Sequence, residues 1–583
     1  MIRVGNCSGF YGDRLSAMRE MLDGGDLDVL TGDYLAELTM LILGRQRMKD
    51  PTRGYASTYL RQLEDCLGTA LEKNVTLVSN AGGLAPERLA GEIRTLAERL
   101  GLTVSVAHVE GDDLHDRAEA LGLGSALTAN AYLGAFGISR CLDAGAQVVV
   151  TGRVTDASVV VAPAISRFGW GRDDLDALAG AVVAGHVIEC GTQATGGNYS
   201  FFTEIADLRH PGFPIAEINS DGTSVITKHD GTGGAVTVGT VTAQLMYEIT
   251  GHHYAGPDVT AKMDTVQLTE DGPDRVRISG PQGGPVRGEA PPPTLKVSRN
   301  VLGGFRNEMT FVLTGLDIEA KEALVRQQIT AALTPPPREL DWTLARTDHL
   351  DSDTEESASA LLRIVVRDSD PTKVGRVFSA AAVELALASY PGFSVTAPPS
   401  EASPYGVFDP AYVDQSVPRH TAVLADGTRV DIDPPTVTAQ LPPDIAPQPE
   451  AAETAPDEPA VLAPLGRIAA ARSGDKGGNA NIGVWVRTDA EWAWLRRTLT
   501  TAAIKELLPE TSDLVVHRYE FPHLLAVNFV IENILGEGVA SGARFDPQAK
   551  GLGEWLRSRH VLIPTALLPA TAPERLIITG GTA

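Results

Sequence analysis

The sequence has few cysteines, no long apolar run and a shortage of basic residues. Its four cysteines, Cys7, Cys66, Cys141 and Cys190, are far apart and lack the paired spacing of a zinc site. With no signal peptide at the start, they indicate a reducing cytoplasm rather than a disulfide framework. No apolar run approaches the roughly 20 residues needed to span a bilayer. We therefore expect a cytoplasmic protein that does not enter a membrane.

Acidic residues outnumber basic ones by 74 to 49, and the formal net charge is −25. Nucleic acids and anionic membranes need a basic face on their partner, so neither is expected to bind. A small anionic ligand needs only a local basic pocket and is compatible with this charge.

At 583 residues, the chain is too long for a single core. The predicted class is α/β: a parallel-sheet N-terminal domain, an α+β second lobe and a small C-terminal ferredoxin-like α+β domain. The predicted boundaries are 1–200 for the parallel domain, 201–430 for a lobe of the same catalytic unit, 431–465 for a proline-rich acidic linker and 466–583 for the ferredoxin-like domain, with its split βαβ arrangement.

Five short apolar runs in the first third are each followed by a glycine-containing polar turn and a helical pattern. The runs lie near residues 2–7, 27–30, 75–78, 104–107 and 147–151. This alternation predicts parallel strands joined by helices. Ligands of open α/β sheets bind outside the carboxyl ends of the strands, so the polar turns should form a common cleft.

The turns supply most of the candidate binding residues. Arg153 could bind a substrate carboxylate, because the planar guanidinium group makes bidentate contacts. Asp156 could position a water or act in catalysis. The alternative is that Arg153 and Asp156 form an internal ion pair that caps the next helix, and that the other residues serve to turn and cap the chain. The candidates are Asp13, Arg14, Asp33, Asn80, Gly82, Gly83, Arg153 and Asp156.

The segment from Glu189 to Asn198 is the most unusual loop, because an acid and a thiol precede two glycine-containing turns. The charge of Glu189 would raise the pKa of Cys190, so Glu189 is preferred as the general acid or base. One alternative is that Cys190 acts as a nucleophile. The other is that both residues only form a polar helix end and have no catalytic role. Amide groups of Gly82, Gly83, Gly196, Gly197 and Asn198, with Asn80, could hold an oxyanion.

His229 is a second candidate proton carrier, since histidine exchanges protons near neutral pH and Asp230 follows it. Adjacent residues of a strand point to opposite faces, however, so a direct pair would need a rearranged turn. The alternative is a surface turn.

The tail around Arg472 to Gly478 is cationic and rich in glycine but lacks the Walker spacing. Asp475 and Lys476 are candidates for substrate binding in the first domain's cleft, with a simple turn as the alternative. No HExxH pattern is present, and His108-Val109-Glu110 lacks the Pro-Cys-x-x-Cys of zinc deaminases. Four acids at strand ends could cluster around Mg²⁺, although no metal is predicted: Asp13, Asp33, Glu110 and Asp156.

Several of these stretches together resemble the acyclic terpene utilisation AtuA family. They are residues 4–14, 31–40, 79–83, 151–156, 189–198 and 229–234, and residues 471–481 are similar to the ferredoxin-fold domain attached to many members. The resemblance covers nearly the whole chain except the linker. It implies a role in the degradation of acyclic terpenoids such as citronellol and geraniol as CoA thioesters. No catalytic residues are carried over from it.

Residues and resemblance together predict an enzyme of terpenoid or branched acyl-CoA or carboxylate metabolism. The expected reaction is proton transfer next to a carbonyl, of the hydratase, isomerase or lyase type. The alternatives are a thioester hydrolase or acyl transferase that uses Cys190, and a non-catalytic subunit of an acyl-CoA carboxylase-type complex. We expect no cofactor beyond CoA as part of the substrate, and a homo-oligomer.

Overall fold

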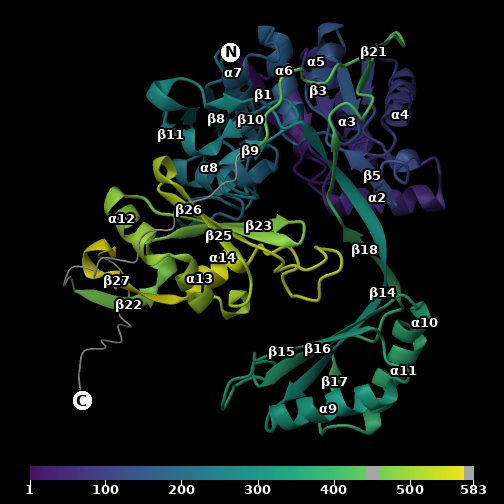
Figure 1. Ribbon diagram of the computed structural model, residues 1–583, viewed down its shortest axis with the longest axis vertical. Coiled ribbons are helices and arrows are strands. Elements are labelled where there is room, and N and C mark those ends of the chain that lie inside the picture. Colours follow the sequence, from purple (N-terminus) through teal and green to yellow (C-terminus); the bar gives the residue numbers. More distant parts are fainter. Residues whose placement is uncertain (442–458, 570–583) are drawn as a thin grey trace. The chain divides into compact units, whose positions relative to one another are not determined.

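A computed structural model describes residues 1–441 and 459–569, which form two compact units (Figure 1). Unit 1 contains residues 1–300, 408–539 and 548 onward, and unit 2 contains residues 301–407 and 540–547. Residues 442–458 of the predicted linker lie outside the described residues. Of the helices in the described ranges, none is both long and apolar enough to cross a membrane.

The centre of unit 1 is a parallel sheet in the order β1-β2-β3-β6-β4, which confirms the predicted α/β class. Antiparallel strands extend it: β7, β8, β12 and β11 beyond β1, and β20 and β21 beyond β4. The parallel strands are β1 (Ile2–Asn6), β2 (Val29–Gly32), β3 (Thr76–Ser79), β4 (Val106–Glu110) and β6 (Val148–Thr151). The antiparallel strands are β7 (Pro214–Ile218), β8 (Ser224–Lys228), β11 (Gln267–Glu270), β12 (Val276–Ser279), β20 (Thr421–Val423) and β21 (Arg429–Asp431).

Helices cover both faces of this sheet, so its strands are apolar on both sides. Val148 and Val150 point into the core beneath α1 (Ala17–Gly24), α3 (Ser57–Glu72) and α4 (Pro86–Arg99). Val149, between them, points into the opposite core with α5 (Phe136–Asp143), α6 (Ser158–Phe168) and α7 (Leu175–Ile188). A run of β-branched residues is therefore buried on both faces, as its pattern predicted.

Helix α7 is the central helix of the second core. It packs against α6, α8 (Val238–Leu245) and the β7–β8 hairpin, and its residues from Leu178 to Ile188 are almost all buried. A helix that is apolar on all sides is expected only in such a position. Its last turn carries His186, and Glu189 follows at its C-terminal end.

Unit 2 has the chain order β14-α9-β15-β16-α11-β17 and an antiparallel sheet in the order β15-β16-β14-β17. This is the split βαβ arrangement of ferredoxin-like folds. Both helices pack on one face of the sheet. Its elements are β14 (Thr294–Thr314, from Val301 on in unit 2), α9 (Ile318–Ala332), β15 (Glu339–Ala345), β16 (Ser359–Asp368), α11 (Arg376–Val383) and β17 (Ser394–Val395).

The C-terminal domain belongs to unit 1 and confirms the predicted split βαβ arrangement, because two parallel strands joined by helices enclose a third, antiparallel strand. Its antiparallel sheet has the order β23-β24-β26-β25, with helices after β24 and after β26. The elements are β22 (Ala460–Pro464), β23 (Ala470–Lys476), β24 (Asn479–Trp485), α12 (Asp489–Thr498), α13 (Thr501–Leu507), β25 (Val516–Phe521), β26 (Ala526–Ile531), α14 (Leu552–Ser558) and β27 (His560–Pro564).

Both faces of this C-terminal sheet are buried. Ile482 and Val484 pack against the domain's own helices. Trp485 and Val530, on the other face, join the core that contains α6 and α7. Side chains alternate along a strand, so one strand contributes to two cores.

Asn481 links the C-terminal sheet to the end of α8. Its amide donates to Met246 O (2.8 Å) and Asn528 Oδ1 (2.9 Å), and its Oδ1 accepts from Glu248 N (3.0 Å). Asn528 Nδ2 in turn donates to Ile249 O (3.1 Å). This buried network fixes the C-terminal domain on unit 1's first domain.

Asn481→Ala should lower the free energy of unfolding by about 2–3 kcal/mol, because it leaves several buried groups without partners. Urea titration of the full chain measures the change. Asn528→Ala and the double variant complete a double-mutant cycle. The double variant should lose less stability than the sum of the losses in the two single variants. Strictly additive costs would contradict the proposed network.

Candidate functional site

Neighbouring strand ends place Asp33, Asn80 and Arg153 together. Asp33 follows β2 and Asn80 follows β3, which pair in parallel up to Gly32 and Ser79. Asn80 Nδ2 donates to Asp33 Oδ1 (2.5 Å). Arg153 follows β6, whose Val150 pairs with Ser79. The parallel register therefore brings the polar turns of three strands to one edge.

Arg153 is almost fully buried, at 3% exposure. Its Nη1 donates to Leu35 O (2.7 Å) and lies 3.0 Å from Asp156 Oδ1, and its guanidinium lies 4.4 Å from the Tyr132 ring centroid. Burial opposes its charge, but Asp156, Tyr132 and Asp33 outweigh this effect and raise its pKa. The internal Arg153–Asp156 pair is thus present, yet Arg153 Nε is buried without a partner among the described residues.

Glu189 joins this group from the end of α7. The side chain of Asn6, at the end of β1, donates to Ile188 O (2.5 Å) and Glu189 O (2.7 Å). A Cβ at Gly9 would lie 2.6 Å from the Cys190 carbonyl carbon, so only glycine lets the first turn approach this segment. The first strand therefore fixes the backbone that carries Glu189.

Two carboxyl groups of the cluster retain their protons to unusually high pH. Burial raises the pKa of Glu189 well above its ordinary value, Asp156 and Glu248 raise it further, and Lys476 and Arg153 oppose the rise. Burial and Asp156 raise the pKa of Asp33 in the same way, against Arg153 and Asn80. Glu189 also lies at the negative end of a helix dipole, which disfavours a carboxylate.

Glu189 has one bonded and one unbonded oxygen. Oε1 lies 3.2 Å from His186 Nδ1, whereas Oε2 is buried with no hydrogen-bond partner in the described part of the chain. Burial lowers the pKa of His186 to about 4, so its imidazole is neutral. The Tyr254 ring covers it at 4.9 Å between centroids. A neutral carboxyl with an unsatisfied oxygen can donate or receive a proton.

The C-terminal domain contributes Lys476 and Asp475 to the same cluster. The charge of Lys476 lowers the pKa values of both His186 and Glu189. The Lys476 side chain makes no hydrogen bond or ion pair of its own within residues 1–441 and 459–569. Burial, Glu248 and Glu37 raise the pKa of Asp475 to about 8.

Two family models match this chain. The model for Acyclic terpene utilisation family protein AtuA matches residues 2–424. The chain belongs to this family. The AtuA ferredoxin-like domain model matches residues 463–562, so the predicted family and its two-part architecture are confirmed. Membership connects the chain with acyclic terpene utilisation. No curated protein and no solved structure matches it.

Cys190 of this AtuA-family chain has the wrong electrostatics for a nucleophile. Burial raises the pKa of its thiol well above its ordinary value, and Glu189 and Glu248 raise it further. A nucleophilic cysteine needs the opposite environment, because only the thiolate attacks. Arg472 opposes the effect only in part: it lies over the Tyr247 ring and bonds Gln193.

Asp13 and Arg14 stabilise their own loop and do not join the cluster. The Asp13 carboxylate accepts from the backbone N–H groups of Gly9 (2.9 Å) and Arg14 (2.8 Å). Arg14 donates to Glu20 (2.7 Å) and to Pro211 O (2.7 Å). Most of their polar atoms are used in these local contacts, although Arg14 Nε has no hydrogen-bond partner among the described residues. The predicted role in substrate binding receives no support from these contacts.

Three of the glycine N–H groups that were predicted to hold an oxyanion bond within their own turns. The N–H groups of Gly83, Gly196 and Gly197 donate to Asn80 O (3.2 Å), Gln193 O (3.2 Å) and Thr192 O (2.9 Å). A Cβ at Gly82 would lie 2.4 Å from Thr151 O, so this glycine permits close backbone packing. Asn198 is exposed at a positive φ of 62°. Backbone N–H groups in turns usually bond within the turn, and those of Gly83, Gly196 and Gly197 are therefore not available to a substrate.

His229 lies apart from the cluster. Its Nε2 is 3.0 Å from Met21 O at the end of α1, and its ring fills the space above Gly24 and Gly25. Burial lowers its pKa, and the charged neighbours that act on it are Arg3, Asp230 and Lys73. The histidine therefore has a structural position, not the predicted catalytic one.

Glu110 also lies apart from the other acids. It pairs with His108 (2.8 Å) and with Arg429, which lower its pKa to about 2. Across the described ranges, no group of three or more His, Cys, Asp or Glu is placed to hold a metal ion. The acids considered for Mg²⁺ thus do not meet at one point.

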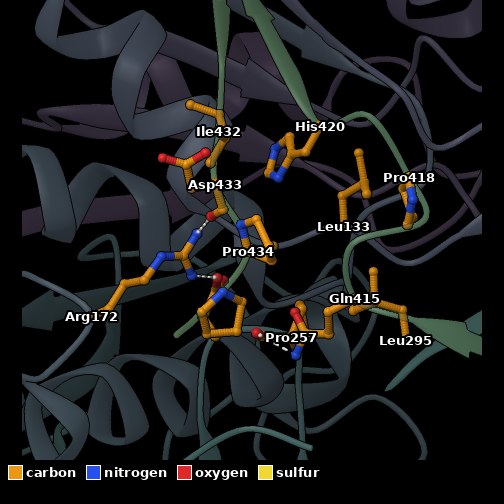
Figure 2. Close-up of a pocket in the computed structure, with 13 residues that line it drawn as sticks. Leu133, Arg172, Pro257, Leu295, Gln415, Pro418, His420, Ile432, Asp433 and Pro434 are labelled. Atoms are coloured by element: carbon orange, nitrogen blue, oxygen red, sulfur yellow. Dashed lines mark hydrogen bonds and ion pairs between the residues drawn. The ribbon is translucent and has the colours of Figure 1, made fainter. Parts of the chain in front are cut away.

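Figure 2 shows a pocket of unit 1 outside this cluster. Arg172 Nη2 donates to Asp433 O (2.6 Å), and its Nη1 lies 3.4 Å from Asp258 Oδ1. Asp258 accepts from Ala135 N (2.6 Å) at the start of α5. Burial lowers the pKa of His420 to about 3. These contacts join the segment after β21 to Arg172, and Arg172 to Asp258, which accepts from the start of α5.

Sequence inspection missed four members of the cluster: His186, Glu248, Tyr132 and Lys296. Glu248 follows α8 at a positive φ of 56°, which is uncommon for a side chain other than glycine, asparagine or aspartate. Strained residues gather at functional sites, but nothing in the local sequence marks this one. His186, one turn before Glu189, could have been found from its spacing of three on a helix.

Proposed function

We propose that this AtuA-family chain is an enzyme that transfers a proton next to the carbonyl group of an acyl thioester or carboxylate. The reaction would be of the hydratase, isomerase or lyase type. The observation that carries the proposal is the buried Glu189 carboxyl, whose Oε2 has no hydrogen-bond partner among the described residues. Proton carriers near neutral pH are commonly acids whose pKa is raised by burial.

In the resting state Glu189 would hold a proton, because burial disfavours its charged form. Glu189 would donate this proton from Oε2 to the carbon beside the carbonyl of an enolate form of the substrate, whose C=C π pair makes the new C–H bond while its C–O⁻ becomes C=O. This step leaves Glu189 as a carboxylate. The resulting carboxylate would then face Lys476 and Arg153, whose charges favour the ionised form. The reverse reaction returns the proton to Glu189.

Lys476 and Tyr254 are better placed than the turn amides to hold a developing oxyanion. The Lys476 ammonium has no partner of its own in the described residues, and Tyr254 keeps its phenol proton because burial and Glu189 raise its pKa. Preorganised donors of this kind often stabilise the transition state more than any other feature of such an active site.

Hydrolysis or acyl transfer through Cys190 receives less support. The raised thiol pKa leaves little thiolate at neutral pH. A non-catalytic subunit would have no need for a neutral carboxyl without a partner. Such a group costs stability, and function is the usual reason for its retention.

Hydrogen exchange tests the proposal. The full chain would be incubated in D₂O with saturated, branched and unsaturated acyl-CoA thioesters, and deuterium beside the carbonyl followed by NMR. Uptake that survives Cys190→Ser is expected. Thioester cleavage that disappears with Cys190→Ser, with no exchange in the wild type, would overturn the proposal in favour of the nucleophile.

Lys476→Met should raise the pKa of Glu189 further, because Lys476 lowers it in the wild type. Activity that needs the protonated acid disappears as the pH rises through this pKa. The alkaline limb of the kcat/KM profile should therefore shift to higher pH, with a lower maximum. Lys476→Arg keeps the charge and should leave the limb in place. A shift to lower pH would contradict the assignment.

A further inference from the structure

Lys296 is a cation near the cluster whose own contacts do not explain its position. It lies in the part of β14 that belongs to unit 1, with Nζ 5.1 Å from the Tyr132 ring centroid and 5.2 Å from that of Phe408. Its only ion pair among the described residues is with Glu37, at a long 3.5 Å. About a quarter of its side chain is exposed, at 27%. The ammonium group thus has N–H donors that no described residue accepts.

Arg153 and Lys296 share one aromatic ring. The Arg153 guanidinium carbon lies 4.4 Å from the Tyr132 centroid, close to the 5.1 Å of Lys296. Each cation–π contact is attractive, but the two like charges repel each other. Burial and Arg153 act to lower the pKa of Lys296, but Tyr132 and Glu37 outweigh them and raise it. The net charge of the chain is −25, so the placement of two cations beside one ring is unusual and requires an explanation.

The N–H groups of these two cations that have no partner among the described residues are suited to bind an anion. Arg153 Nε is buried and has no partner among the described residues, although the side chain is only 3% exposed. A guanidinium edge and a nearby ammonium together suit a planar carboxylate. A dianionic phosphate fits less well, because Glu37, Asp156 and Asp33 surround the same cations.

We propose that Arg153 and Lys296, held on Tyr132, form a subsite for a free carboxylate of the substrate. This inference rests on the proposed function and deepens it. The substrate is an acyl compound with an acid group in addition to the carbonyl beside which Glu189 moves a proton. Lys476 serves the reacting carbonyl, and the Arg153–Lys296 pair orients the other end.

Calorimetry on the full chain at low ionic strength tests the subsite. The probes are glutarate, the neutral glutaramide and inorganic phosphate. Lys296→Met should weaken glutarate binding about 10- to 100-fold, the usual loss for a hydrogen bond to a charged group. Lys296→Arg keeps the charge and should stay within a few-fold of the wild type. Glutaramide should bind weakly to every variant.

Lys262→Met is the matched control. Lys262 is equally exposed, at 29%, and also pairs with one glutamate, Glu289, at 3.2 Å. The Lys262→Met variant should bind glutarate as tightly as the wild type. Equal glutarate binding by Lys296→Met and the wild type would overturn the proposal. Loss of phosphate binding but not of glutarate binding would also overturn it and would assign the cations to a CoA phosphate.

Glu189→Gln separates this inference from the proposed function. It should bind glutarate like the wild type and lack proton exchange. Full exchange activity in Glu189→Gln would reject proton transfer by Glu189, while the Lys296→Met result would still decide the carboxylate subsite.

Discussion

Glu189→Gln is expected to lower the rate of proton transfer by about 10³-fold, within the 10²–10⁴ usual for a general acid or base. The amide has the shape of the carboxyl but no proton to donate at neutral pH. The same variant should be more stable than the wild type above pH 5, by about 1 kcal/mol, because active-site groups are often retained at a cost to stability.

The sign of the stability change follows from proton binding. The unfolded chain ionises Glu189 near its ordinary pKa of 4.5, whereas the folded chain keeps the proton to higher pH. Between these two pKa values the folded state binds more protons, so stability falls as the pH rises. Glutamine does not titrate and abolishes this pH dependence. Wild type and variant should melt together near pH 4 and separate as the pH increases.

Glu217→Gln is the control for this result. Glu217 is also buried, at 4% exposure, but it pairs with Arg3 and with Arg275 (2.6 Å). Its substitution should lower stability and leave exchange activity unchanged. If Glu189→Gln were also destabilised at pH 8, the carboxyl would have to be ionised in the folded protein, and its role as a proton donor would be wrong.

Much of the site's framework could be predicted from the sequence, because strand ends are local features. The β-branched run before Arg153 indicated a buried strand, and parallel strands bring their ends to one edge. Asp33, Asn80 and Arg153 were found in this way. Glu189 was found because its neighbours were unusual, although its position depends on Asn6, which is far away in the chain.

The remaining members of the site depend on contacts that no local pattern encodes. Lys296 and Tyr132 meet because β14 pairs with β5 (Thr128–Ala131), a strand that was not predicted. Glu248 reaches the cluster through a positive-φ turn held by Asn481. His229 lies outside the cluster because its hairpin end faces α1. Residue type indicated chemistry in each case, but only tertiary contacts decide which groups have donors to spare.

Arg153→Met should lower the free energy of unfolding by about 3–5 kcal/mol, the usual cost of removing one partner from a buried ion pair. Leu35 O would lose its donor and Asp156 its counter-charge. Arg153 also lowers the pKa of Asp33, so the pKa of Asp33 should rise further and the carboxyl should retain its proton. Substrate binding should weaken in parallel, since the cation proposed to hold the carboxylate is gone.

Two further variants separate charge from geometry in this result. Arg153→Lys keeps the charge but loses the planar fork, so it should recover part of the stability and little of the affinity for a carboxylate. Arg153→Met combined with Asp156→Asn removes both charges and should cost less than the two single changes together. Urea titration measures stability, and glutarate calorimetry measures affinity. A stability loss below about 1 kcal/mol for Arg153→Met would mean that solvent screens the guanidinium as it screens a surface pair. The interpretation of the cluster as buried and the proposal of a carboxylate subsite would then both be wrong.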